Sequence, residues 1–115
     1  MPTLKHMLTA SLLVGLSTVS TVALAQAKDI MVSFKDGVVT PNQIEVKANT
    51  NVKIIVQNNG KSAGEFESKL LHIEKVVPAG AKVTILIRNI APGKYKFVDE
   101  FTEDKPTAHG IIIAK

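Results

Sequence analysis

The feature that most constrains the fold of this chain is a period-two alternation of apolar and polar residues that begins near residue 30. Apolar side chains recur at every second position in residues 30–35, 44–47 and 83–88, and helical spacing of apolar residues is nearly absent. Successive side chains of an extended strand point to opposite faces. The alternation therefore predicts strands that bury one face and expose the other.

Turn-forming residues separate the alternating segments at intervals of about eight to twelve residues, the spacing of sandwich and barrel proteins. Examples are Asp36-Gly37, Pro78-Ala79-Gly80 and Ala91-Pro92-Gly93. We predict an all-β fold of about seven or eight short strands, arranged as an antiparallel sandwich or barrel. Two connections, residues 58–68 and 99–109, are longer and more acidic than a turn requires. Loops held on a rigid β scaffold are frequent functional sites.

The N-terminal segment predicts export. Lys5 and His6 precede an uncharged, largely apolar run over residues 7–24, and small residues follow at Ala23 and Ala25. A basic head, an apolar middle and a small-residue exit are typical of a secretory signal peptide. We predict a signal peptide at residues 1–25, a periplasmic domain at residues 28–115, and cleavage before Gln26 or, as a second option, before Lys28. The alternative is an uncleaved membrane anchor, because about 18 residues is the lower limit for a span.

Composition excludes several classes of function. The sequence contains no cysteine, so the chain has no disulfide and cannot form a blue-copper centre, which depends on a thiolate. Without Lys5, 13 of the 14 basic residues remain against 10 acidic ones, a net charge of +3. The lysines are spread along the chain and form no block interleaved with aromatics, so nucleic acid is not indicated. No Gly-x-Ser-x-Gly elbow or phosphate-binding glycine loop is present, which argues against a hydrolase.

Four short motifs follow one another in a recognisable order over the predicted domain. They are Val39-x-Pro41-x-x-Ile44-x-Val46, Val52-x-Ile54-x-Val56-x-Asn58, Val77-Pro78-Ala79-Gly80 and Ala91-Pro92-Gly93-x-Tyr95-x-Phe97. Their order and spacing resemble the cupredoxin fold. The resemblance implies a Greek-key β-sandwich in which copper ligands come from two loops at one end.

The positions that carry copper ligands in cupredoxins differ in this chain. The resemblance places the cysteine position at Asp99 and the next ligand position at Thr102. It places the methionine position near Ala108-His109 and the upstream histidine position within residues 65–68. The resemblance therefore implies that the scaffold is retained and that carboxylates replace the soft ligands.

One branch of the superfamily is more closely similar. The residues that carry this similarity are Glu65-Phe66-Glu67-Ser68, Glu74-Lys75 and Phe97-x-Asp99-Glu100-Phe101. They resemble cupredoxin-like periplasmic proteins associated with high-affinity iron permeases. The resemblance implies that iron is handled in the periplasm beside an inner-membrane iron permease and other uptake components.

The cupredoxin resemblance implies that the two acidic loops open at the same end of the sandwich, and we predict there a metal site that consists of Glu65, Glu67, Asp99, Glu100 and His109. The two glutamates of the first loop have period-two spacing, so both side chains face one way on an extended backbone. Several carboxylates with one imidazole suit Fe²⁺, Mn²⁺ or Cu²⁺ better than Cu⁺, and further negative oxygens favour Fe³⁺.

The alternative for each carboxylate is a solvated surface group that pairs with Lys61, Lys69 or Lys105, and we assign Glu103 and Asp104 to the surface. His72 lies on a predicted strand, outside the site.

Three functions remain open from the sequence. The first is a periplasmic protein that binds iron, or oxidises it, for a permease. The second is a copper-binding accessory protein that uses His109 and carboxylates without a thiolate. The third is an interaction module that kept the sandwich and lost the metal. The sequence leaves open whether the chain is an oxidase, because stabilising Fe³⁺ would also favour oxidation of Fe²⁺.

Overall fold

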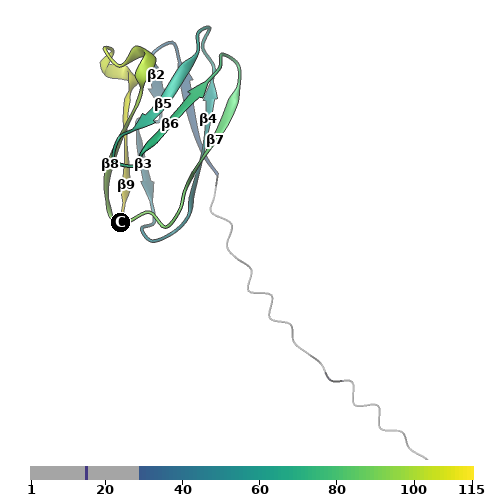
Figure 1. Cartoon of the computed structure of the whole chain (residues 1–115), viewed down its shortest axis with the longest axis vertical. Coiled ribbons are helices and arrows are strands. Elements are labelled where there is room, and N and C mark those ends of the chain that lie inside the picture. Colours follow the sequence, from purple (N-terminus) through teal and green to yellow (C-terminus); the bar gives the residue numbers. More distant parts are fainter. Residues whose placement is uncertain (1–14, 16–28) are drawn as a thin grey trace, which may run out of the picture.

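The computed structural model describes Gly15 and residues 29–115, and the strands between Ile30 and Ala114 form a two-sheet β-sandwich (Figure 1). Apart from Gly15, the predicted signal peptide and both cleavage sites lie outside the described residues. No helix in residues 29–115 is long and apolar enough to cross a membrane. The strands are β1 (Ile30–Lys35), β2 (Val38–Thr40), β3 (Gln43–Val46), β4 (Val52–Asn58), β5 (Gly64–Ser68), β6 (Ile73–Val77), β7 (Lys82–Ile87), β8 (Gly93–Asp99) and β9 (His109–Ala114).

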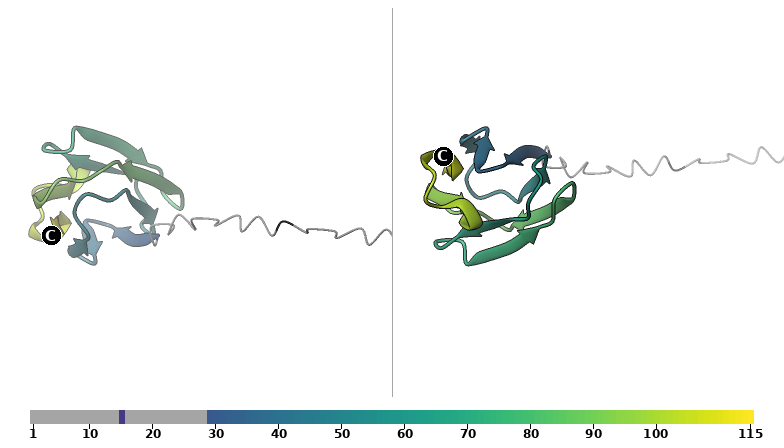
Figure 2. Two further views of the ribbon diagram at one scale, coloured as in Figure 1. Left: turned by 90° about the horizontal axis from the view of Figure 1, so that it is seen from below. Right: turned by 90° about the horizontal axis from the view of Figure 1, so that it is seen from above.

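The strands form a four-stranded sheet of order β2-β1-β4-β7 and a five-stranded sheet of order β3-β9-β8-β5-β6. In the end-on views of Figure 2 the strands of the two sheets surround a common interior. The all-β sandwich predicted from alternation is confirmed. Two pairings, β1 with β4 and β3 with β9, are parallel rather than antiparallel. Alternation could not indicate this, because it reports which face of a strand is buried and not its direction.

The core consists of the inward positions of both sheets. Its largest fully buried side chains include Phe34, Phe66 and Phe97. The Phe66 ring lies between the other two, with ring centroids 6.4 Å from Phe34 and 5.1 Å from Phe97, and both pairs are stacked. The phenylalanine of the acidic 65–68 segment is thus a core residue. Its burial fixes the glutamates on either side of it toward the outer face.

The segment 58–68, predicted as a loop, contains strand β5 at its C-terminal end. Strand β5 was not predicted, because its outer face carries Glu65 and Glu67, and glutamate is uncommon in strands. A short strand, β2, follows the turn at Asp36-Gly37 and pairs antiparallel with β1. His72 lies in the turn between β5 and β6 with φ of 54°, and not on a strand as predicted.

A buried asparagine organises the connection between β4 and β5. Asn58 is 2% exposed, and its Nδ2 donates hydrogen bonds of 2.9 Å to the carbonyls of Ser62 and Val77. Its Oδ1 accepts the Gly60 N–H at 2.9 Å. Every polar atom of the side chain is therefore used to hold this loop against the end of β6.

The connection between β8 and β9 contains two short 3-10 helices, η1 (Glu100–Thr102) and η2 (Pro106–Ala108). This matches the long acidic loop predicted at residues 99–109. Both helices lie at the end of the sandwich opposite the C-terminus (Figure 1). On β9, Gly110 faces the Phe97 ring so closely that a Cβ at this position would overlap the ring.

Candidate metal centre

Four glutamates converge on the outer face of the five-stranded sheet. Glu65 and Glu67 lie on β5, Glu74 lies on β6 and Glu100 begins η1. One carboxylate oxygen from each residue lies within 4.8 Å of those of the other three. We call these four residues the carboxylate cluster.

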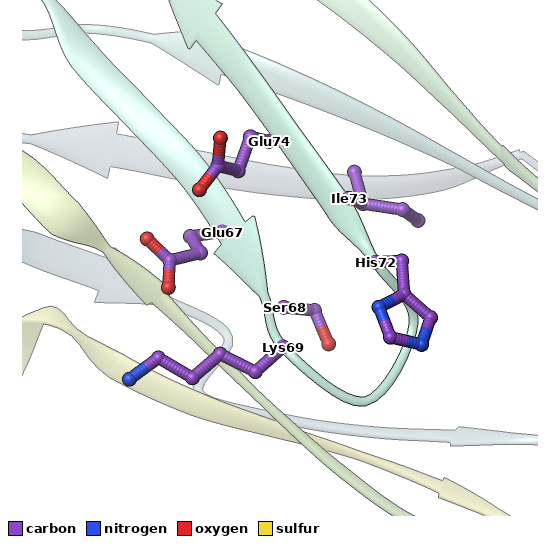
Figure 3. Close-up of a pocket in the computed structure, with 6 residues that line it drawn as sticks. All are labelled: Glu67, Ser68, Lys69, His72, Ile73 and Glu74. Carbon is purple, nitrogen blue, oxygen red and sulfur yellow. The ribbon is translucent and has the colours of Figure 1, made fainter.

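The strand register explains why the cluster forms. In the antiparallel β5–β6 hairpin, Glu67 stands directly opposite Glu74, and Figure 3 shows both carboxylates on the same side of the sheet. Cross-strand neighbours on one face are close enough to interact directly. On the other side of β5, Phe66 pairs with Asp99, the last residue of β8. The chain leaves the sheet immediately afterwards, which brings Glu100 beside the two glutamates of β5.

Glu67 occupies the least exposed position of the cluster, because its side chain is only 8% exposed. Its hydrogen bond with Glu100 is the largest cause that raises its pKa above the ordinary value. Burial and repulsion by the Glu100 charge raise this pKa further, and attraction from Lys69 partly opposes them. Two carboxylates can form a hydrogen bond only when one of them carries a proton. The raised pKa of Glu67 therefore means that this pair holds a proton more tightly than an isolated glutamate does, because two negative charges would lie close together.

No cationic side chain in residues 29–115 forms an ion pair with the cluster. The two ion pairs in this part of the chain are Lys53–Asp29 and Lys115–Glu45, and both lie elsewhere. The ion pairs with Lys61, Lys69 or Lys105 that the alternative predicted for these carboxylates are therefore absent among the described residues. A buried carboxylate without a cationic partner is costly, and a bound cation would remove that cost.

Asp99 was predicted as a ligand, but its side chain lies away from the cluster. It is 4% exposed and faces the interior, where its Oδ1 accepts the backbone N–H of Glu65 at 3.0 Å. It pairs in register with the inward-facing Phe66, and this register directs its side chain to the opposite side of the sheet from Glu67.

His109 also lies outside the cluster. It is exposed on the first position of β9, and its Nε2 is 2.7 Å from the backbone carbonyl oxygen of Glu103. It lines a surface groove with Lys96 of β8, Ile111 of β9 and Glu67 of the cluster, but its ring nitrogens are not among the ligand atoms that converge in the cluster. Glu103 and Asp104 are exposed, in agreement with their assignment to the surface.

The structure thus brings together three of the five predicted ligands, Glu65, Glu67 and Glu100, and adds Glu74. The prediction omitted Glu74 because its position depends on the hairpin register. The hairpin turn is centred on Leu70-Leu71, which places Glu74 opposite Glu67. Recognising that turn in the sequence would have added Glu74 to the predicted site. His72 lines an open hollow with Glu67 and Glu74, and Figure 3 shows its imidazole directed away from both carboxylates.

The fold and the cluster together define a class of protein, a β-sandwich with an all-oxygen cluster on its larger sheet. Residues 7–114 match the family described as the cupredoxin-like domain, and the chain belongs to this family. It is 35% identical over 85 residues to an uncharacterised protein of Rickettsia prowazekii (strain Madrid E), a match over 74% of this chain. The chain spans 66% of the length of that relative, slightly less than two thirds.

Solved structures share the fold at low sequence identity. Auracyanin B superposes with a TM-score of 0.63 at 13% identity, over 76% of this chain and 88% of that one. A copper-binding protein in the apo form gives 0.63 at 19% identity, over 76% and 86%. The metal-binding domain of the Cu(I)-exporting P-type ATPase of Streptococcus pneumoniae D39 gives 0.62 at 12% identity, over 76% and 84%. These similarities establish the fold.

The candidate ligands of this chain differ from the thiolate-containing ligand set of a blue-copper centre. A blue-copper centre needs a thiolate, and the sequence contains no cysteine. The residues brought together here are carboxylates, which suit ions that prefer oxygen ligands.

Proposed function

We propose that this protein is a periplasmic metal-binding protein that binds iron for an inner-membrane iron permease. The observation that carries the proposal is the carboxylate cluster, in which Glu67, only 8% exposed, meets three other carboxylates without a cationic partner among the described residues. Relief of this repulsion by a cation would supply part of the binding free energy.

The donor set favours an oxygen-preferring ion. Four carboxylates carry up to four negative charges, so a trivalent or divalent cation is balanced better than a monovalent one. The cluster contains no sulfur and no imidazole, the ligands that select Cu⁺ and favour Cu²⁺. Fe³⁺ and Fe²⁺ meet these requirements, as does Mn²⁺. The choice of iron rests on the similarity to proteins associated with iron permeases.

The compartment and the partner extend the proposal beyond the cluster. The basic head, apolar run and Ala-x-Ala exit of residues 1–25 support export to the periplasm. The motifs around Glu65, Glu74 and Asp99 support association with an iron permease. An iron-permease gene next to the gene for this protein would strengthen the link, and a neighbourhood without transport genes would weaken it.

Metal titration of the mature protein tests the proposal. We expect micromolar or tighter binding of Fe³⁺ as a soluble chelate, and of Fe²⁺ under anaerobic conditions, measured by calorimetry. Glu67→Gln removes one ligand charge and should weaken binding at least about tenfold. Glu103→Gln changes an exposed carboxylate outside the cluster and should leave binding unchanged. If the wild type binds no metal ion, the interaction-module alternative takes precedence.

A copper-binding role is the second candidate, and His72 is the observation that favours it. This residue lines the same hollow as Glu67 and Glu74, so rotation of its side chain would add an imidazole to the donor set. Imidazole suits Cu²⁺. Cu²⁺ binding that is lost in His72→Ala, while Fe²⁺ binding is retained, would support copper. Equal Cu²⁺ affinity in both proteins would count against it.

A further inference from the structure

Asp99 is the last residue of β8 and directly precedes η1, and its side chain does not cap that helix. It is the N-cap residue of η1, but its carboxylate makes no hydrogen bond to that helix. Aspartate at an N-cap normally accepts an N–H of the first turn. Here Oδ1 instead accepts the backbone N–H of Glu65 on the neighbouring strand at 3.0 Å.

This hydrogen bond replaces one that the sheet lacks. The β5–β8 ladder pairs Glu67 with Val98 and Phe66 with Asp99, and it ends there. The next pair would join Glu65 to Glu100, but Glu100 has already turned into η1. The Asp99 carboxylate therefore satisfies the Glu65 N–H, so that Glu100 can leave the ladder without leaving a backbone donor unpaired.

Gly64 makes room for this contact. A Cβ at Gly64 would lie 3.0 Å from Oδ2 and 3.1 Å from Oδ1 of Asp99, and 3.1 Å from a ring carbon of Phe34. Any larger residue would push the carboxylate or the ring away. The sequence Gly64-Glu65 thus supplies both the space and the donor that the Asp99 side chain requires.

We propose that Asp99 is a positioning residue for the carboxylate cluster, which holds Glu65 and Glu100 in place as a hydrogen-bond acceptor and is not itself a metal ligand. Asp99 is joined to Glu100 by the chain and to Glu65 by the hydrogen bond, so it links two of the four glutamates. This inference rests on the proposed metal-binding function of the cluster. It also assigns a role to the residue at the position where the family resemblance placed a cysteine.

Two substitutions separate the positioning role from a ligand role. Asp99→Asn keeps an oxygen acceptor at Oδ1 and removes the charge, whereas Asp99→Ala removes the acceptor. The probes are Mn²⁺ and anaerobic Fe²⁺, titrated into the mature protein. We expect Asp99→Asn to bind both ions nearly as well as wild type and Asp99→Ala to bind about 10–100-fold more weakly, the range typical of groups that orient ligands. Glu67→Gln serves as the reference for a lost ligand.

Two further measurements keep the result decisive. Amide hydrogen exchange at Glu65, followed by NMR, should be slow in wild type and Asp99→Asn and faster in Asp99→Ala. Gly64→Ala leaves the carboxylate in the chain but crowds it, so it should also weaken metal binding and speed exchange at Glu65. This variant serves if Asp99→Ala does not fold.

The outcomes are distinguishable. If Asp99→Asn loses as much affinity as Glu67→Gln, Asp99 is a ligand and the inference is overturned. If Asp99→Ala and Gly64→Ala both bind as wild type does, Asp99 positions nothing. If wild type itself binds neither ion, the proposed function fails. In that case, an unchanged rate of amide hydrogen exchange at Glu65 in Asp99→Ala would overturn the positioning role as well. A faster rate would show that Asp99 positions the carboxylates even though they bind no metal.

Discussion

At the scale of single residues, the neighbours of Glu67 determine the pKa of its carboxyl group. Its carboxylate faces Glu74 across the hairpin and shares a hydrogen bond with Glu100, which raises its pKa. A carboxyl group with a higher pKa in the folded chain than in the unfolded chain binds more protons when folded. Its contribution to stability is therefore complete below the unfolded pKa and declines as pH rises through the folded value.

The first prediction is a pH dependence of stability. Wild-type protein without metal should lose thermal stability relative to Glu67→Gln as pH rises from about 4.3, the ordinary glutamate value, through the raised pKa of Glu67. The glutamine cannot ionise, so this variant lacks that particular decline. Calorimetric melting over a pH series would measure the difference. Parallel curves for the two proteins would contradict the prediction.

The second prediction concerns protons and metal at the same residues. A metal ion and a proton compete for a carboxylate, so affinity for Mn²⁺ should fall as pH is lowered through the raised pKa of Glu67. Titrations in buffers of different ionisation enthalpy would count the protons released on binding. A site that releases none would show that Glu67 is ionised before the metal arrives.

At the scale of elements, the Asn58 side chain holds the β4–β5 connection, and the third prediction tests it. Asn58→Asp replaces the Nδ2 donor, which leaves the carbonyls of Ser62 and Val77 without this partner and places a charge beside them. Each buried unsatisfied group costs about 1–3 kcal/mol, so the free energy of unfolding should fall by several kcal/mol. Urea unfolding measures it. Asn59→Asp is the matched control, because Asn59 makes only an exposed side-chain bond to Ser33.

The fourth prediction concerns the contact between β8 and β9. Gly110→Ala would place a methyl group against the Phe97 ring, and overpacking of this kind costs about 1–3 kcal/mol. Phe97→Leu in the same chain should recover part of that loss, because the smaller side chain leaves space for the methyl group. Chemical unfolding of the single and double variants measures the coupling. Simple additivity would indicate that the two residues do not contact each other.

The sequence predicted the elements better than it predicted the site. Alternation identified the buried faces of most strands and placed Glu65 and Glu67 on one side, because a strand repeats every two residues. It could not place Glu74, because the pairing of β5 with β6 depends on where the hairpin turns. Asp99 lies at the end of a strand, where the register with Phe66 decides which face its side chain takes. That register is a property of two distant segments.

At the scale of the whole molecule, the proposed metal site would couple metal binding to folding. A ligand that binds only the folded chain stabilises it by about 2.7 kcal/mol at 100 times its dissociation constant. The fifth prediction is that Fe²⁺ or Mn²⁺ raises the melting temperature of the mature wild-type protein by several degrees. The shift should be absent in a variant with Glu65→Gln, Glu67→Gln and Glu74→Gln together. An equal shift in both proteins would place the metal elsewhere.

The position of β9 has a consequence for the order in which the two sheets can form. This last strand lies between β3 and β8, and it is the strand with which β3 pairs. The larger sheet therefore cannot reach its full strand order until the six residues of β9, His109–Ala114, lie between these two strands. β3 and β9 are separated by most of the domain's sequence, so the larger sheet depends on a pairing between distant segments and is expected to form late in folding.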